Sequence, residues 1–296
     1  MKVLIGANAD DAGRDALALG SLLCRALDAE PLLCHVHPAD FQFPSQSAAE
    51  AEWANYLERQ ATEVLADAQQ EMAETYGWDN VDSIIGTHHS SGKGLADVAS
   101  AELADFVVIG TGPGARSGEL HVGSTADKLL HGSPVPVALA PAGYRRDAPE
   151  KIGKVVVGFR DTPESKLALA KGGELADAAH APLSTLTVLV RHRLRGGKFG
   201  GRTQDELLAE QQQRSVAAQE AALEALGVAE PQTEAVIADS ARSALQRMQW
   251  DGDEVLILAS APGGPLKRVF LGDMTYKLLR SSPVPTIVLP RHQDVA

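Results

Sequence analysis

The sequence predicts two consecutive α/β domains of one kind, each with a parallel sheet covered by helices on both faces. Three observations predict this class: the length, an internal repeat, and the alternation of strand-like with helix-like segments. At 296 residues the chain exceeds a typical single domain and suits two domains of roughly 150 residues. Apolar residues make up 44% of the chain but aromatic residues only 4%. The cores must therefore be built from Ala, Val, Leu and Ile, as is usual where helices cover a parallel sheet.

The internal repeat is the strongest of these observations. The segment KLLHGSPVPVALAP at 128–141 recurs as KLLRSSPVPTIVLP at 277–290, with eight identical positions at a constant offset of 149. Near the start of each copy, KVLIG at 2–6 matches KVVVG at 154–158, at an offset of 152. The seam between the copies, at 141–153, is rich in Pro, Gly and charge, which is typical of an exposed linker. We therefore expect domains at 1–142 and 152–296.

Short apolar runs alternate with segments of helical periodicity along each copy. In the first copy we expect strands at 3–7, 31–37, 81–87, 106–110 and 135–140. Its expected helices are 12–26, 47–76, 95–103 and 124–130, the longest with Trp53, Leu57, Ala61, Val64, Ala68 and Met72 on one face. In the second copy, 154–159, 183–190, 232–238, 254–259 and 284–289 have the pattern of strands. Such alternation requires parallel pairing through right-handed crossovers, and ligands of these sheets bind beyond the carboxyl ends of the strands.

Charge and cysteine usage exclude several classes of protein. A formal net charge of −12 argues against a nucleic-acid partner, because neutralising phosphates requires clustered Lys and Arg. Cys24 and Cys34 are too few for a disulfide framework and suit buried thiols in a reducing cytosol. The apolar run at the N-terminus is too short for a signal segment or a membrane span. We expect a cytoplasmic protein with no membrane partner.

Several chemical motifs are matched only in part. GTGPGA at 110–115 has dinucleotide-fingerprint spacing but follows the fourth strand, whereas that fingerprint belongs after the first. GTHHSSGKG at 86–94 misses the phosphate-loop pattern and is more typical of a helix entrance. Five histidines gather near one edge of the predicted sheet without metal-ligand spacing: His35, His37, His88, His89 and His121. We expect no metal site and no catalytic residue, since no nucleophile elbow or triad motif is visible.

The loop after the fourth strand is the candidate binding site. It is rich in glycine and leads into Gly123, Ser124 and Thr125 at the start of a helix. Main-chain N–H groups in such a loop, together with a helix N-terminus, form a cradle for phosphate oxygens. The alternative is a glycine-rich turn in which Ser124 is an ordinary N-cap.

These features resemble the universal stress protein family. Its ATP-binding members carry G-x2-G-x9-G-[ST] at this position, an Asp after strand one, a His-Val pair ending strand two and a Pro-rich last strand. The resemblance covers nearly the whole chain, once per copy. It implies two tandem Rossmann-like domains of the adenine-nucleotide α-hydrolase-like type, each with five parallel strands in the order 3-2-1-4-5. It also implies an intramolecular pseudo-dimer through the last strands, and a homodimer of two such chains.

The resemblance implies a nucleotide site in the first copy, for ATP or AMP, with Mg²⁺ accompanying ATP. Gly110, Gly123 and Ser124 match the family glycines and serine, and Val36 matches a residue that contacts adenine. Pro113 replaces the second glycine and offers no N–H, while Asn8 replaces the Asp. The expected nucleotide-binding residues are Asn8, Val36, Gly110, Gly112, Gly114, Gly123, Ser124 and Thr125.

The second copy departs further from the family pattern. Its equivalent positions hold Arg160, Ala259, Pro262, Gly272 and Asp273. The Asp273 carboxylate would lie where phosphate should bind, so we expect a degenerate site. The basic, glycine-rich segment at 191–204 suits a surface loop or, alternatively, a docking site for an acidic partner.

The leading functional hypothesis is a stress-response protein that binds ATP or AMP through its first domain as a sensor or regulator. The alternative is a scaffold that binds no nucleotide and works through protein–protein contact, which Asn8 and Pro113 favour. A third hypothesis is an enzyme, at most a slow ATPase, against which stands the lack of a general base near the loop.

Overall fold

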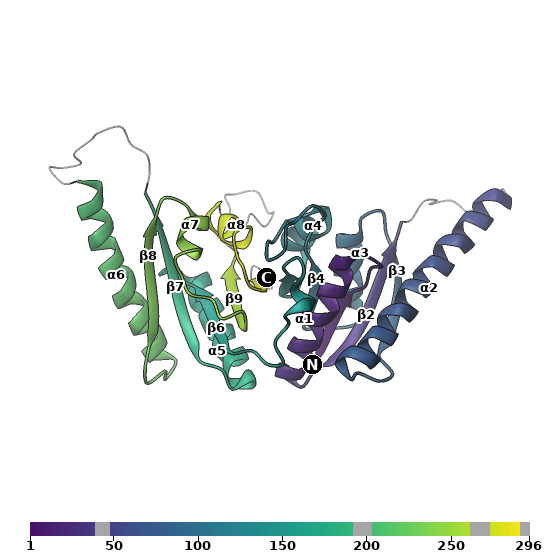
Figure 1. Ribbon diagram of the computed structural model, residues 1–296, viewed down its shortest axis with the longest axis horizontal. Coiled ribbons are helices and arrows are strands. Elements are labelled where there is room, and N and C mark those ends of the chain that lie inside the picture. Colours follow the sequence, from purple (N-terminus) through teal and green to yellow (C-terminus); the bar gives the residue numbers. More distant parts are fainter. Residues whose placement is uncertain (39–47, 192–202, 261–272, 291–296) are drawn as a thin grey trace, which may run out of the picture. The chain divides into compact units, whose positions relative to one another are not determined.

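The computed structural model describes residues 1–38, 48–191, 203–260 and 273–290, the side chains of 48–51 excepted (Figure 1). The chain divides into two compact units, Met1–Lys151 and Ile152–Ala296. Each unit alternates strands with helices and has one wholly parallel sheet. The class predicted from the sequence, two α/β units built on parallel sheets, is confirmed.

The first unit contains five strands and four long helices among its described residues. In chain order these are β1 (Lys2–Gly6), α1 (Asp11–Leu27), β2 (Glu30–His37), α2 (Ala48–Tyr76), β3 (Asp82–Thr87), α3 (Ser91–Ala101), β4 (Phe106–Gly110), α4 (Ser124–Gly132) and β5 (Val137–Ala140). Strand β1 pairs with β2 and β4, β2 pairs with β3, and β4 pairs with β5, so the order is β3-β2-β1-β4-β5. The winding reverses between β1 and β4, which is where ligands of such sheets bind.

The helices pack as two pairs on this sheet. Helix α1 contacts β1, β4 and β5 and also α2, whereas α3 contacts β2, β3, β4 and α4. The centre of the sheet is strongly apolar, with Val3, Leu4 and Ile5 of β1 fully buried. Cys24 and Cys34 are buried free thiols, as the sequence predicted.

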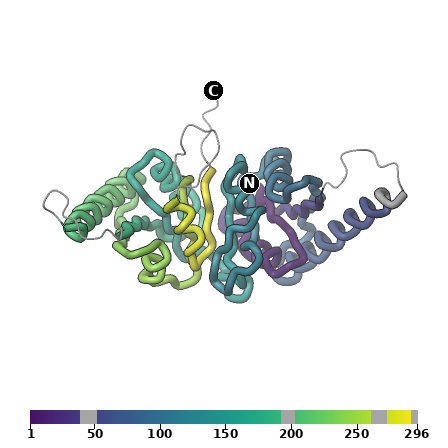
Figure 2. Tube along the Cα trace, turned by 90° about the horizontal axis from the view of Figure 1, so that it is seen from above, coloured from purple at the N-terminus to yellow at the C-terminus, as the bar shows by residue number. Residues whose placement is uncertain are grey.

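Helix α2 is covered over only part of its length. Ala61, Ala68 and Met72 are buried as expected, but Trp53 is 45% exposed and stacks on Tyr56 with ring centroids 5.4 Å apart. The N-terminal part of α2 extends past the end of β3 (Figure 1), and Figure 2 shows the same helix running outward from the rest of the first unit. The apolar face predicted to run from Trp53 to Met72 therefore continues beyond the sheet that covers its C-terminal half.

Helix α3 begins at Ser91, four residues before the expected start at residue 95. Gly92 lies where α3 approaches α4 closely. A Cβ there would lie 2.5 Å from the carbonyl oxygen of Thr125. Glycine at this position allows α3 and α4 to pack closely, and α3 continues through it.

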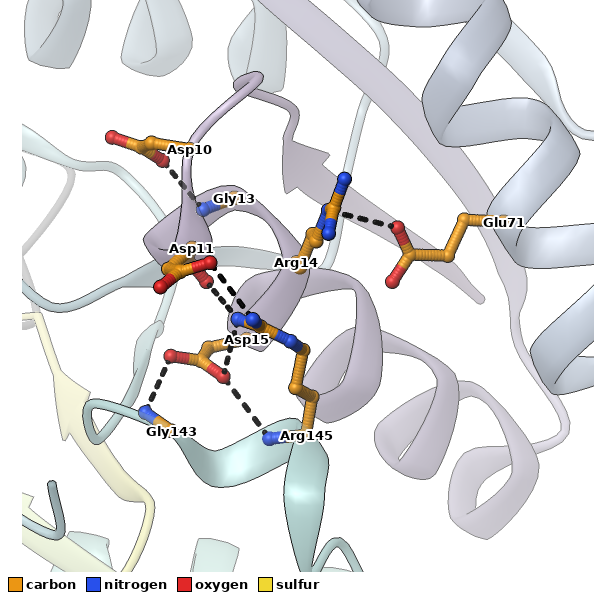
Figure 3. Close-up of polar contacts among 8 residues, drawn as sticks. All are labelled: Asp10, Asp11, Gly13, Arg14, Asp15, Glu71, Gly143 and Arg145. Carbon is orange, nitrogen blue, oxygen red and sulfur yellow. Dashed lines mark hydrogen bonds and ion pairs between the residues drawn. The ribbon is translucent and has the colours of Figure 1, made fainter.

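The seam differs from the expected exposed linker over its first half. Tyr144–Arg146 forms a 3₁₀ turn in which Tyr144 is buried. The carboxylate of Asp15, 1% exposed on α1, accepts hydrogen bonds from the N–H of Gly143 (2.7 Å) and of Arg145 (3.0 Å) (Figure 3). The Arg145 guanidinium lies 3.6 Å from Asp15 and 2.8 Å from the carboxylate of Asp11. We call these contacts the Asp15 clasp.

The second unit repeats the same architecture. Its elements are β6 (Lys154–Gly158), α5 (Pro163–Ala179), β7 (Leu183–Val190), α6 (Gln204–Ala225), β8 (Gln232–Ala238), α7 (Ala241–Leu245), β9 (Glu254–Ala259), α8 (Asp273–Leu279) and β10 (Thr286–Leu289). The strand order is β8-β7-β6-β9-β10. Across the described parts of both units, every helix is too short or too polar to cross a membrane.

The Asp15 clasp predicts an unequal effect of two similar substitutions. Asp15→Asn places an amide N–H₂ against main-chain donors in a buried site, so we expect the free energy of unfolding to fall by roughly 2–4 kcal/mol. Asp11→Asn removes only an exposed ion pair and should lower it by less than about 1 kcal/mol. Urea denaturation of the full chain measures both values, and equal effects would contradict the clasp.

Candidate functional site

The turn between β1 and α1 forms one side of the candidate site. Asp10 is the N-cap of α1, and its Oδ1 accepts a hydrogen bond of 2.9 Å from the Gly13 N–H. The side-chain amide of Asn8 donates to the other oxygen of Asp10 at 3.1 Å. A Cβ on Gly13 would lie 2.1 Å from the Asn8 carbonyl oxygen, so this tight turn requires glycine. The turn leaves the Oδ1 atom of Asn8 as a hydrogen-bond acceptor at the carboxyl end of β1.

The loop after β4 forms the opposite side and is closed at its base by hydrogen bonds to His121. The His121 N–H donates to the buried Thr111 Oγ1 at 2.6 Å, and the Gly112 N–H donates to the His121 carbonyl at 2.7 Å. These bonds bring Gly112 beside Gly123, where a Cβ on Gly112 would lie 2.9 Å from the Gly123 Cα. The two ends of the loop thus meet at the start of α4.

Helix α4 begins at this junction without a side-chain cap. Its N-cap is Gly123, which has extended backbone geometry and no side-chain hydrogen bond to the helix. The first intrahelical bond runs from the Asp127 N–H to the Gly123 carbonyl at 2.9 Å. The N–H groups of Ser124, Thr125 and Ala126 therefore have no partner within the helix, and they lie at the positive end of its dipole.

A cavity of about 200 Å³ lies between the β1–α1 turn, the ends of β2 and β4, and the start of α4. The structure brings seven of the eight predicted residues together around it: Asn8, Val36, Gly110, Gly112, Gly123, Ser124 and Thr125. Gly114 is separate and lines an adjoining hollow together with Asp11, Asp15 and Arg146. Gly114 has φ of +83°, a backbone conformation of this turn that glycine adopts more readily than other residues. Pro113 lines both spaces.

The charge around the cavity is unusual for an anion site. The described residues that line it include no Lys or Arg, and Asp10 is the one carboxylate among them. Both Asp10 oxygens accept hydrogen bonds from the turn itself. An anion here would be held by main-chain N–H groups and the helix dipole. Among the hydroxyl groups of the lining residues, that of Thr111 is engaged with the main chain of His121.

Asp10, Ser91 and His35 are among the lining residues that were not on the predicted list. Asp10 could have been found, because an Asp directly before a helical pattern is a strong N-cap signal. Ser91 lines the cavity at the start of α3 and was missed because that helix was expected to begin later. His35 lines the cavity from β2. The His-Val pair of the family resemblance marked this position, but only Val36 was predicted as a binding residue.

His37 and His88 each form a hydrogen bond with a neighbouring residue. The Nε2 atom of His37 lies 3.0 Å from the Thr87 hydroxyl, and the Nδ1 atom of His88 accepts from the Ser90 N–H at 2.9 Å. Over the described ranges, no three His, Cys, Asp or Glu side chains are grouped so as to hold a metal ion.

The corresponding region of the second unit is described in part. Arg160 is exposed just after β6, and Asp273, exposed at the start of α8, pairs with Lys277. Ala259 ends β9. Pro262 and Gly272 lie outside the described residues, as do positions 192–202 of the basic segment.

Comparison with known proteins places this site in context. The model of the universal stress protein family matches residues 1–141 and, a second time, residues 151–290. The chain belongs to the universal stress protein family. Universal stress proteins of Mycobacterium bovis and Mycobacterium tuberculosis are each 29% identical to it over 292 residues, covering 98% of this chain and 100% of theirs.

Solved structures share the fold of this universal stress protein. One from Archaeoglobus fulgidus has a TM-score of 0.65 and 16% identity, covering 98% of both chains. A functionally unknown protein from Pseudomonas aeruginosa has a TM-score of 0.59 and 15% identity, covering 98% of this chain and 92% of its own. The family and fold expected from the sequence are thus confirmed.

The two buried thiols, one of which lines the cavity, predict a loss of stability at alkaline pH. Burial raises the pKa of Cys24 and of Cys34 from 9.0 to about 12. A raised folded-state pKa means that stability is complete below pH 9 and is lost as the pH rises toward 12. Between pH 8.5 and 10 we expect the free energy of unfolding to fall by about 1 kcal/mol per thiol. Urea titrations should show this slope for the native chain and a flatter one for the Cys24→Ala/Cys34→Ala double variant. Equal slopes would contradict it.

Proposed function

We propose that this universal stress protein binds an adenine nucleotide, ATP or AMP, in its N-terminal unit and acts as a cytoplasmic nucleotide-responsive regulator. The observation that carries the proposal is the uncapped N-terminus of α4, whose free N–H groups face a cavity lined by the predicted residues. Residues 1–142 form the binding domain in this proposal, and residues 152–296 form its degenerate copy.

The start of α4 suits a phosphate group for two reasons. First, the helix dipole and the N–H groups of Ser124, Thr125 and Ala126 favour an anion. Second, glycine at the N-cap adds no side chain that would satisfy these N–H groups, and it packs against Gly112, where a Cβ on Gly123 would lie 3.2 Å from the Gly112 Cα. Because Lys and Arg are missing from the described lining, Mg²⁺ bound with ATP would supply the counter-charge. Pro113 removes one N–H from the loop but leaves those of α4 unchanged.

The nucleoside part suits the apolar part of the cavity lining. Val36 of β2, Leu95 of α3 and Ile109 of β4 line it and offer an apolar surface for a base. Asn8 at the end of β1 offers a polar group for the base or the ribose.

The second unit lacks this combination in our proposal. Asp273 puts a carboxylate at the position that corresponds to Ser124, where it would repel a phosphate. Arg160 corresponds to Asn8 and replaces a neutral acceptor by a cation. We therefore propose one nucleotide per chain.

A scaffold without nucleotide is the second candidate function. The observation that favours it is the charge of the cavity, which combines the Asp10 carboxylate with a lining that includes no cationic side chain among the described residues. Nucleotide titration separates the two candidates, because the scaffold predicts no binding at the cavity.

The test gives the first unit, at position 124, the carboxylate that the second unit carries at the corresponding Asp273. Ser124→Asp keeps a residue that is favourable in the first turn of a helix but adds a carboxylate beside the phosphate position. Two unit charges about 4 Å apart repel by about 1 kcal/mol in water and about 4 kcal/mol near a protein surface. We expect calorimetry on the full chain to show ATP binding weakened at least fivefold, with adenosine binding unchanged.

Ser124→Ala is the matched control and should retain most of the ATP affinity, because the main-chain N–H groups remain. The native chain should bind one ATP. No measurable ATP binding would overturn the proposed function, and a stoichiometry of two would overturn the degenerate second site.

A further inference from the structure

The packing of α6 on the sheet of the second unit leaves two buried polar atoms without a hydrogen-bond partner. They are the hydroxyl oxygen of Thr185, a residue of β7 that is 1% exposed, and Oε1 of Gln219, a residue of α6 that is fully buried. Within the described parts of the chain, the other buried side-chain nitrogen and oxygen atoms all have a partner. Because buried polar atoms are nearly always paired, two exceptions at one helix need a physical explanation.

Both residues belong to the interface between α6 and β7, which we call the α6 seam. Side chains alternate along a strand, so Thr185 and Thr187 share one face of β7. Helix α6 covers that face, since Nε2 of Gln219 donates to the Thr187 hydroxyl at 2.7 Å and to the Glu234 carbonyl at 3.1 Å. The Thr187 hydroxyl donates in turn to the Phe159 carbonyl at 2.8 Å. The α6 seam is therefore polar and only partly satisfied.

The equivalent interface of the first unit, between α2 and β2, is apolar. The registers of β2 on β1 and of β7 on β6 place Thr185 at the position of Leu33, which is fully buried. The helices also correspond, because their inward-facing residues recur with the same spacing of four, three and four. In α2 these are Ala61, Leu65, Ala68 and Met72, and in α6 they are Gln212, Val216, Gln219 and Leu223. Two glutamines of α6 thus take the positions of two buried alanines of α2.

These replacements change what it costs to lift the helix from the sheet. The four α2 residues are buried, whereas Gln212 and Val216 of α6 are only half-buried. Gln212 donates to the Ala235 carbonyl, and such bonds are exchanged for bonds with water at little net cost. The two unpaired atoms of the α6 seam gain water as a partner when the helix lifts. Lifting α2 exposes apolar side chains to water instead, which is unfavourable.

We propose that α6 separates from β7 and β8 as one unit under native conditions, while the other elements of the second unit stay folded. Each unpaired atom favours the open form by about tenfold, so the two together favour it by about 100-fold. This conformational opening does not depend on nucleotide binding. It gives the second unit a property of its own beyond that of a degenerate copy.

Hydrogen exchange of the full chain at low urea concentrations tests the proposal, because it measures the opening of each helix separately. Protection factors of the amides at 216–223 in α6 should be about 100-fold lower than those at 65–72 in α2. Helix α5 is the control within the second unit, since Leu169 and Leu175 are buried on it. Its amides at 169–176 should keep high protection. Equal protection of α6 and α2, or exchange of α5 together with α6, would overturn the proposal.

Two threonine substitutions on the same face of β7 should act in opposite directions. Thr185→Val keeps the shape of the side chain and removes an unpaired hydroxyl, so α6 should open about tenfold less often. Thr187→Val removes a hydroxyl that bonds both Gln219 and Phe159, so α6 should open about tenfold more often.

The pair of variants separates the proposed cause from a general effect on stability. An unchanged opening of α6 in Thr185→Val, or changes of the same sign in both variants, would show that the unpaired atoms do not control the helix. Protection of α2 should stay at the native value in both. The comparison of α6 with α2 and α5 in the native chain decides the matter even if a variant does not fold.

Discussion

The candidate site depends on two hydrogen bonds that close the base of the loop after β4. They join His121 to Thr111 and Gly112 and thereby place Gly112 against Gly123. That contact requires glycine at 112, where a Cβ would lie 2.8 Å from the Gly123 nitrogen, and α4 has glycine at its N-cap. The residues of the first turn line the cavity, and their N–H groups have no side-chain cap. The same constraint that shapes the loop therefore leaves the helix start on which our proposal rests.

The surroundings of the loop connect this site to the end of the first unit. The Gly118 N–H donates to the Ala142 carbonyl at 2.8 Å, and the Ala142 N–H donates to the Glu119 carbonyl at 3.1 Å. The next residues are held by Asp15 on α1, whose N-terminal turn also borders the cavity (Figure 3). The loop, the segment after β5 and the start of α1 thus form one hydrogen-bonded assembly.

Much of the fold was predictable because buried parallel strands are continuous apolar runs between turn residues. The strands at 183–190, 232–238 and 254–259 match the structure at both ends. The predictions from sequence were wrong where the role of a residue lies in tertiary packing and not in local structure. Helix α3 begins at Ser91 and not at residue 95, with Gly92 allowing it to approach α4, and Trp53 follows a helical period that continues beyond the sheet. The charged seam suggested an exposed linker, whereas the buried Asp15, distant in sequence, binds it.

The candidate site was predictable at the level of its glycine loop and helix start, since these are consecutive in sequence. The part of the lining that comes from other strands was less predictable, because His35 and Asp10 meet the loop only through the order of the strands. Backbone amide NMR of the full chain tests the central claim most directly. The account predicts that ATP, but not adenosine, shifts the amide resonances of Ser124, Thr125 and Ala126 more than any others. Phosphate-dependent shifts confined to another part of the chain would contradict it.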